Sequence, residues 1–260
     1  MLCERSVELD IVIPVYNEGC TIIRTLATLA QIKTPFQVLI CYDFDEDDTL
    51  KAIRERGDNR GIRFVKNTGR GPHAAVISGF KASKAPFVLV YPADDDYNAG
   101  IVDDMVRRAL EGSDIVCASR FMPGGNMVGC PLLKKILVRL AGGSLHKLAR
   151  IPTHDATNGF RMFSRRLVER VQIESSEGFS YSLELLVKCH RLGWPITEIP
   201  AQWHERTVGK SRFRVLRWLP AYLDWYCYAF ATTYLRRGAS CIPEKAEATR
   251  RRSTHEQTSQ

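Results

Sequence analysis

Residues 87–100 read FVLVYPADDDYNAG, a run of apolar residues followed by three consecutive aspartates. The apolar run has the length of a buried strand, so Asp94, Asp95 and Asp96 are predicted to stand where that strand ends. Like charges side by side repel one another, and the repulsion grows as water is withdrawn. Two interpretations are open at this point: a solvated acidic turn, or a site for Mg2+ or Mn2+, hard cations that prefer carboxylate oxygens.

Apolar runs and helical patterns alternate through the first 118 residues. Strands are predicted over 10–16, 36–43, 62–67, 87–94 and 113–119, and helices over 19–32, 47–57, 71–83 and 100–112. This alternation predicts an α/β fold of βαβ units, with a mostly parallel central sheet and helices on both faces. Ligands of such sheets bind at the carboxyl ends of the strands. The polar residues that follow four of the strands are therefore expected along one edge: Tyr16, Asn17 and Glu18; Asp43; Asn67; and Asp94 with its two neighbours.

The pattern changes after residue 119. Residues 131–151 have the pattern of a basic amphipathic helix, interrupted near Gly142 and Gly143. Residues 154–164 read as a turn leading into a short strand, and residues 181–193 as a second helix. A strand over 195–203 contains Pro200, which places that strand at the edge of the sheet.

Charge is divided unevenly along the chain. The 260 residues carry a net charge of +8, yet residues 1–118 hold 18 acidic against 14 basic residues, and residues 119–153 contain no acid. A basic half indicates an anionic partner, which is nucleic acid, an anionic membrane surface or a phosphorylated substrate. The acidic first half argues against a nucleic-acid groove, so no nucleic-acid partner is expected.

Cysteine usage and the first residues indicate a cytoplasmic protein. The eight cysteines are scattered without a C-x-x-C pair, and the charged first residues lack the apolar core of a signal peptide. Reduced cysteines of this kind are typical of the cytoplasm. The motifs G-x-G-x-x-G and G-x-x-x-x-G-K-[ST] are both absent, which argues against a dinucleotide fingerprint and a P-loop.

Six segments, taken together and in this order, resemble the family 2 glycosyltransferases of GT-A fold. They are IPVYNE (13–18), YDFDEDDT (42–49), NTGRGPHAAVISGFKAS (67–83), PADDD (92–96), DIVCASR (114–120) and DATNGFR (155–161). The branch that they resemble most is that of the polyprenyl-phosphate sugar synthases. The resemblance extends from about residue 10 to about residue 217.

The resemblance implies roles for residues of the first half. Pro14, Tyr16 and Glu18 match the segment that holds the nucleotide base, and Asp43 matches an aspartate that contacts the nucleoside. Asp94 matches the second aspartate of a D-x-D motif, which binds the metal that bridges the diphosphate.

Two positions depart from the family pattern. Tyr42 precedes Asp43 where the family has paired aspartates, and Pro92 replaces the first aspartate of D-x-D. The acidic motif then reads as residues 94–96, with Asp94 and either Asp95 or Asp96 as ligands of Mg2+ or Mn2+.

The second half supplies the basic residues. Arg120, Arg139 and Arg206 match positions that cluster around phosphates in the lipid-phosphate branch, and Lys210 with Ser211 falls in a G-x-S-K-like stretch. The residues expected to carry the transfer itself are Asp94, Asp96, Arg120 and Arg206.

The resemblance implies metal-dependent, inverting transfer of a hexose from a GDP- or UDP-linked donor to a polyprenyl phosphate. A lipid phosphate is already an anion at neutral pH and needs arginines rather than a general base. An alternative acceptor, the hydroxyl of a sugar in a surface polysaccharide or lipopolysaccharide, would need a base. Asp155 is the best candidate for that base and Glu184 a weaker one. A non-catalytic nucleotide-binding module is a further alternative.

The segment from 217 to 235 is rich in aromatic residues and is predicted to be a helix. Dense Trp and Tyr beside arginines are typical of a helix that lies in a membrane interface, although an ordinary packing helix is also consistent with the pattern. The predicted organisation is a domain over 1–212, with a nucleotide-sugar half (1–118) and an acceptor half (119–212). An interfacial helix follows over 213–235, and then a disordered basic tail over 236–260. The protein is expected at the cytoplasmic face of a membrane, as a peripheral enzyme.

Overall fold

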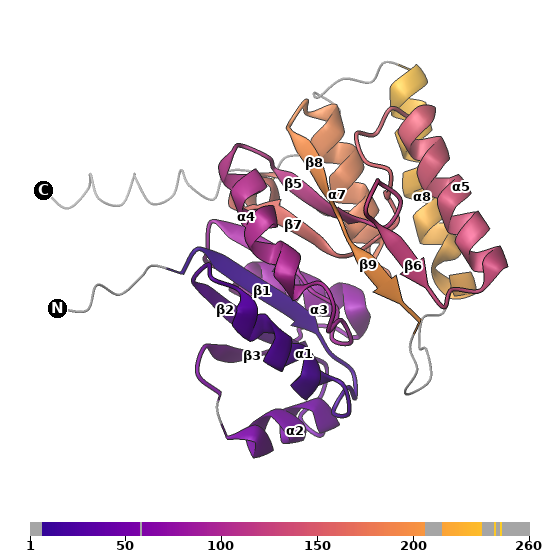
Figure 1. Ribbon diagram of the computed structural model, residues 1–260. Coiled ribbons are helices and arrows are strands. Elements are labelled where there is room, and N and C mark those ends of the chain that lie inside the picture. Colours follow the sequence, from indigo (N-terminus) through magenta and orange to yellow (C-terminus); the bar gives the residue numbers. More distant parts are fainter. Residues whose placement is uncertain (1–6, 58, 206–214, 236–241, 243–244, 246–260) are drawn as a thin grey trace, which may run out of the picture.

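The computed structural model describes residues 7–57, 59–205 and 215–235, together with 242 and 245. Its centre is a seven-stranded sheet in the order β3-β2-β1-β4-β7-β5-β8 (Figure 1). The strands are β1 (Leu9–Pro14), β2 (Phe36–Tyr42), β3 (Ile62–Lys66), β4 (Phe87–Val90), β5 (Ile115–Ser119), β7 (Arg161–Ser164) and β8 (Ile196–Pro200). Within this sheet β7 runs antiparallel to both of its neighbours, and the other pairings are parallel. The predicted mostly parallel sheet is confirmed.

The direction of the strands decides where a site can form. Because β7 lies between β4 and β5 and opposes both, the remaining strands all point the same way. Their carboxyl ends therefore meet at one edge, which we call the carboxyl edge. At the margin of the sheet β8 ends at Pro200, which confirms the predicted edge strand.

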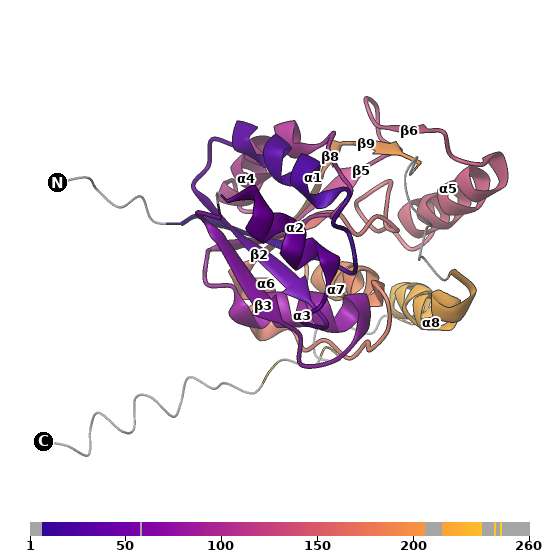
Figure 2. The ribbon, with the colours of Figure 1, turned by 90° about the horizontal axis from the view of Figure 1, so that it is seen from below.

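Helices cover both faces of the sheet, as predicted. One face carries α1 (Ile22–Thr28), α2 (Asp48–Arg56) and α4 (Val102–Leu110), with the short turns η1 (Leu29–Gln31) and η2 (Ala99–Ile101). The other carries α3 (Gly71–Ala82), α6 (Arg165–Arg170) and α7 (Ser180–Arg191). Successive residues of a strand point to opposite faces, so Ile11 and Ile13 join the first core while Val12 joins the second. Figure 2 shows the two helical layers on either side of the sheet.

A smaller unit stands beside this sandwich. It contains the parallel pair β6 (Asn126–Val128) and β9 (Gln202–His204) and the helices α5 (Leu132–Lys147) and α8 (Val215–Tyr234). In both views α5 and α8 lie side by side (Figures 1 and 2).

The interruption predicted near Gly142 and Gly143 is wrong, because α5 runs through both glycines. A Cβ on Gly142 would lie 2.9 Å from the carbonyl oxygen of His154. The glycine thus permits close packing of the helix, and its cost in helix propensity is offset by that contact.

The aromatic residues of α8 face the protein to a large extent. Tyr222, Trp225 and Tyr226 pack against the core of the second face, and the hydroxyl of Tyr226 lies 2.7 Å from Ser144 Oγ on α5. None of the helices in the described part of the chain combines the length and the apolar composition needed to cross a bilayer. The predicted tail falls outside the described residues apart from Ile242 and Lys245, and so does the run 206–214.

Candidate active site

The predicted site residues come from the ends of neighbouring strands. Pro14 ends β1, Asp43 follows β2, Asn67 follows β3 and Asp94 lies shortly after β4, while Arg120 follows β5. The structure therefore brings them to the carboxyl edge, where the sequence predicts Asp43, Asn67 and Asp94. Arg206, Lys210 and Ser211 lie outside the described residues.

Asp43 joins three elements at this edge. Its Oδ1 accepts a hydrogen bond from Asn67 Nδ2 at 2.7 Å, and its Oδ2 accepts one from the backbone N–H of Gly71 at 2.8 Å. Gly71 begins α3 with φ of +88°, a conformation that favours glycine. Asn67 Oδ1 is buried and has no hydrogen-bond partner among the described residues. Asp43 and Asn67 thus form a fixed polar pair. Its one unused acceptor among the described residues is Oδ1 of Asn67.

The loop after β1 is held by the start of α2. The N–H of Asn17 donates to both carboxylate oxygens of Asp47 at 3.0 Å, and the N–H of Glu18 donates to Thr49 Oγ1 at 2.8 Å. Asp47 also caps α2, because it accepts from the N–H of Thr49 at 2.9 Å. The ring of Tyr16, 48% exposed, is thereby presented at the surface, where it forms a T-shaped pair with Phe44.

Asp47 and Thr49 are positioning residues that sequence reasoning missed. Asp47 is 1% exposed although four other acids lie within five residues of it. The available signal was an aspartate two residues before a threonine at the start of a helical pattern, which is typical of an N-cap.

The three aspartates that follow β4 do different things. Asp95 accepts hydrogen bonds from the N–H groups of Tyr97 and Asn98 and from Asn98 Nδ2, at 3.0, 2.9 and 2.6 Å. Burial raises the pKa of Asp95, although these donors oppose the shift. Asn98 Nδ2 in turn donates to the carbonyl of Gln202. Asp95 therefore shapes the loop and fastens it to β9.

Asp96 is better placed than Asp95 to bind a cation with Asp94. Its Oδ2 lies 2.7 Å from Arg24 Nε, and its Oδ1 is buried with no hydrogen-bond partner in the described part of the chain. Among the described residues there is no group of three His, Cys, Asp or Glu side chains that could enclose a metal. Mg2+ does not require one, because it usually keeps waters and is bound by one or two carboxylates together with substrate phosphates. Asp94 and Asp96 fit such a shared metal.

Arg120 and Asp155 form a buried bidentate ion pair. Arg120 Nε and one terminal nitrogen donate to the two oxygens of Asp155 at 2.6 and 2.8 Å, and the Arg120 backbone N–H adds a third bond at 3.0 Å. Burial alone would raise the pKa of Asp155, but the charge and hydrogen bonds of Arg120 outweigh it and lower the pKa. Asp155 is fully buried, and the side chain of Arg120 is 10% exposed. This carboxylate is saturated with donors and is a poor general base.

The second candidate base is saturated as well. Glu184 is fully buried on α7 and accepts from Lys188 Nζ at 2.6 Å. The backbone N–H groups of Glu174 and Ser175 also donate to it. Neither carboxylate that the sequence offered for base catalysis is open to a substrate.

A basic hollow of about 370 Å³ opens next to the buried ion pair. Its wall includes Arg120, Lys135 and Arg139, and the loop between β5 and β6. The guanidinium groups of Arg120 and Arg139 lie 5.3 and 6.0 Å from the centre of the Phe121 ring. Two of the three arginines predicted to surround a phosphate are thus brought together.

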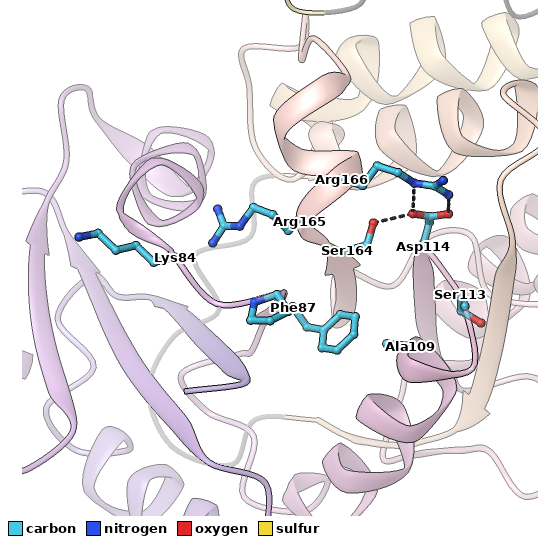
Figure 3. Close-up of a pocket in the computed structure, with 10 residues that line it drawn as sticks. Lys84, Phe87, Ala109, Ser113, Asp114, Ser164, Arg165 and Arg166 are labelled. Atoms are coloured by element: carbon cyan, nitrogen blue, oxygen red, sulfur yellow. Dashed lines mark hydrogen bonds and ion pairs between the residues drawn. The ribbon is translucent and has the colours of Figure 1, made fainter. Parts of the chain in front are cut away.

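A larger hollow, of about 630 Å³, lies at the opposite edge of the sheet (Figure 3). Arg166 Nε and Ser164 Oγ both donate to Asp114 there, at 3.1 and 2.6 Å. Arg165 donates to the carbonyl of Ala85. Asp114 and Arg166 neutralise each other, and the residues that line this hollow include none of the predicted site residues that the structure describes.

Comparison with known proteins supports one family. The model of glycosyl transferase family 2 matches residues 10–172. A dolichol-phosphate mannosyltransferase of Pyrococcus furiosus is 23% identical over 231 residues, which cover 84% of this chain and 64% of that protein. A polyprenol monophosphomannose synthase of Mycolicibacterium smegmatis is 24% identical over 210 residues, which cover 78% of this chain and 79% of that protein.

Solved structures support the fold. Glucosyl-3-phosphoglycerate synthase from Mycobacterium tuberculosis, crystallised with Mn2+, UDP-glucose and phosphoglyceric acid, superposes with a TM-score of 0.63. It is 18% identical, and the match covers 86% of this chain and 80% of that one. The predicted GT-A-type α/β fold is confirmed. Since the family model also covers more than half of the chain, the protein belongs to glycosyl transferase family 2.

Proposed function

We propose that the protein transfers a hexose from a GDP- or UDP-linked sugar to a polyprenyl phosphate, with inversion and with the help of Mg2+ or Mn2+. The observation that carries the proposal is the basic hollow beside the saturated carboxylate of Asp155. An acceptor that must lose a proton finds neither Asp155 nor Glu184 open as a base, whereas an acceptor that is already anionic finds the charges of Lys135 and Arg139, next to Arg120 in its ion pair with Asp155. The names of the Pyrococcus and Mycolicibacterium relatives support the same acceptor class.

The donor side of the site is assigned to the ends of β1 to β4. Asp43 and Asn67, with Pro14, Tyr16 and Glu18 nearby along the edge, would hold the nucleoside, because they offer a rigid set of acceptors and an exposed ring. Asp94 and Asp96 would hold the metal. When bound, the metal neutralises the negative charge that develops on the departing diphosphate.

The acceptor side is assigned to Lys135 and Arg139, next to Arg120 in its ion pair with Asp155, with Arg206 and Lys210 as further candidates outside the described residues. These cations would hold the phosphate anion in line with the anomeric carbon. A phosphate oxygen forms the new bond to that carbon while the bond to the diphosphate breaks, and the electron pair leaves with the diphosphate. No proton changes hands, which is why no base is required. The reaction would take place at the cytoplasmic face of a membrane, where the lipid resides.

The test is a two-sided substrate panel. GDP- and UDP-hexoses are each incubated with a short-chain prenyl phosphate or with a free oligosaccharide, in Mn2+, in Mg2+ or in EDTA. We expect a prenyl-phosphate sugar, formed only with metal. Transfer to the oligosaccharide instead would favour the hydroxyl acceptor. If a donor binds in calorimetry but no product or hydrolysis appears with either acceptor, the result would favour a non-catalytic module.

A further inference from the structure

One half of α5 is apolar where it faces solvent. Five large side chains in its first three turns are between 45% and 72% exposed: Leu132, Leu133, Ile136, Leu137 and Leu140. Elsewhere in the described chain, large exposed apolar residues are more scattered; one example is Leu110 at the end of α4, 66% exposed. Single exposed leucines are ordinary, but a contiguous group of this kind marks an interaction surface. We call these five residues the α5 face.

The helix geometry places this face opposite the protein. At 3.6 residues per turn, the five side chains span an arc of about 140°, and the centre of that arc is diametrically opposite the buried pair Gly142 and Leu145. Arg139 and then Lys135 border the arc on one side, whereas Lys134 lies nearer the inner face and is paired with Glu205 at 3.2 Å. The helix therefore has an inner contact face, an outer apolar face and a basic border.

The second helix of this unit extends the same surface. Residue numbers increase together along the contacts between the two segments, since Ser144 contacts Tyr226 and Ala149 contacts Thr233. The helices α5 and α8 therefore run parallel. The exposed Leu219 and Leu223 of α8 thus lie at the same end of the pair as the α5 face. The aromatic residues that the sequence assigned to an interface pack partly inward, and the more exposed apolar surface is on α5.

Charge indicates what covers the α5 face. Residues 119–153 contain no acid, although Glu205 pairs with Lys134. The border residues Lys135 and Arg139 are joined by the exposed Lys147 and Arg150 farther along the chain. An apolar helical face with a basic border is the pattern of a helix that lies in the interface of an anionic bilayer. An apolar helix of a second protein would bury the leucines but would supply no negative charge to neutralise the neighbouring basic residues.

We infer that the α5 face inserts into the surface of a membrane that contains anionic lipids. Insertion would set the basic hollow at the level of the lipid headgroups, because Lys135 and Arg139 line the hollow from this same helix. A lipid phosphate could then reach Lys135 and Arg139 in the hollow without leaving the interface. The access of a lipid phosphate to the hollow rests on the proposed function, whereas membrane binding through α5 does not.

The experiment compares vesicle binding by the full chain and two variants. Vesicles contain phosphatidylcholine with phosphatidylserine, or phosphatidylcholine alone. The test variant carries Leu133→Asp and Leu137→Asp, and the control carries Leu110→Asp at an equally exposed leucine. We expect the parent and the control to sediment with the anionic vesicles, less so at high salt, and the test variant to bind about tenfold or more weakly. A milder pair, Leu133→Ser with Leu137→Ser, replaces the test variant if its thermal melting shows misfolding.

Equal vesicle binding by the parent and the test variant would overturn the inference, and so would a parent that binds neither kind of vesicle. If the parent instead self-associates in light scattering and the test variant is monomeric, the α5 face is an interface between copies. Transfer to a short-chain, water-soluble prenyl phosphate separates the two proposals. The test variant should keep that activity and lose transfer to a long-chain lipid in vesicles. Vesicle binding without any transfer to prenyl phosphate would leave the docking surface in place and contradict the proposed function.

Discussion

The two halves of the carboxyl edge hold their carboxylates in different ways. In the donor half, Asp43, Asp47 and Asp95 are held by backbone N–H groups, hydroxyls and amides, which carry no net charge. In the acceptor half, Asp155 is held by a guanidinium. The first arrangement leaves negative charge in place, so a cation can be attracted, although Asp96 of the same half is paired with the exposed Arg24. The second neutralises its carboxylate, so the positive charge of Arg139 and Lys135 remains for an anion.

The largest effect is expected where the donor half keeps its negative charge. Asp94→Asn should lower the rate of transfer by about a thousandfold or more and abolish metal-dependent donor binding, because a metal ion stabilises the leaving group by several kcal/mol. The melting temperature should change little. Asp104→Asn, on the surface of α4, is the matched control and should behave like the parent. Near-normal turnover of Asp94→Asn would show that the negative charge of Asp94 is not needed to bind a metal for the transfer.

The next effect separates two arginines of the acceptor half. Arg120→Ala should lower the free energy of unfolding by about 3–5 kcal/mol, because it leaves the carboxylate of Asp155 buried without its partner. Arg139→Ala removes an exposed side chain and should leave unfolding nearly unchanged. Both should weaken binding of a prenyl phosphate, by about tenfold or more for the loss of a charge-assisted hydrogen bond. Urea unfolding measures the free energy of unfolding of each variant, and initial rates against acceptor concentration measure its KM for the prenyl phosphate.

The outcome that would contradict this distinction is equal stability of the two variants. It would mean that Asp155 does not depend on Arg120 in solution. Unchanged acceptor kinetics in both variants would place the lipid phosphate away from the basic hollow.

The sequence predicted more of the donor half than of the acceptor half, for physical reasons. Asp43, Asn67 and Asp94 each directly follow an apolar run, and parallel strands bring such positions together whatever the side-chain packing. Arg120 was identified through the family resemblance, and the structure places it directly after β5. Its pairing with Asp155 joins residues 35 positions apart through a turn that has no periodic pattern, so the sequence did not show that the two charges cancel.

The packing of α5 and α8 could not be predicted from amino-acid composition. Dense aromatic residues predicted an interfacial α8, yet aromatic rings serve a protein core equally well, and Trp225 lies 5.0 Å from the buried ammonium of Lys188. The paired glycines of α5 predicted a break, but a glycine also permits close contact, which only the approach of His154 reveals. The outcome in each case was decided by tertiary neighbours.

A smaller effect concerns pH and the buried ion pair. The folded pKa of Asp155 is lowered, so its ionisation stabilises the fold above the unfolded value of about 4, and this contribution is lost as the pH falls through the folded pKa. The parent should therefore exceed Asp155→Asn by about 2 kcal/mol in unfolding free energy at neutral pH. The difference should shrink below pH of about 4 as the parent carboxylate is protonated. Denaturant unfolding of both proteins across this range checks the sign, and a constant difference would contradict it.

The smallest effect uses two adjacent glycines to test how α5 is seated. Gly142→Ala would place a methyl group 2.9 Å from the carbonyl oxygen of His154, whereas the same group on Gly143 would meet nothing within 4 Å. Backbone oxygen cannot turn aside as a flexible side chain does, so Gly142→Ala should cost about 1–2 kcal/mol of stability in spite of the better helix propensity of alanine. Gly143→Ala should be neutral or stabilising by up to about 1 kcal/mol. The helix propensity gain is common to both variants, so the difference between their melting temperatures reports the His154 contact alone. Stabilisation by both substitutions would mean that α5 stands away from the turn that carries Asp155. The wall of the basic hollow would then be looser than the donor half, where a Cβ on Gly79 of α3 would lie 2.4 Å from Val12.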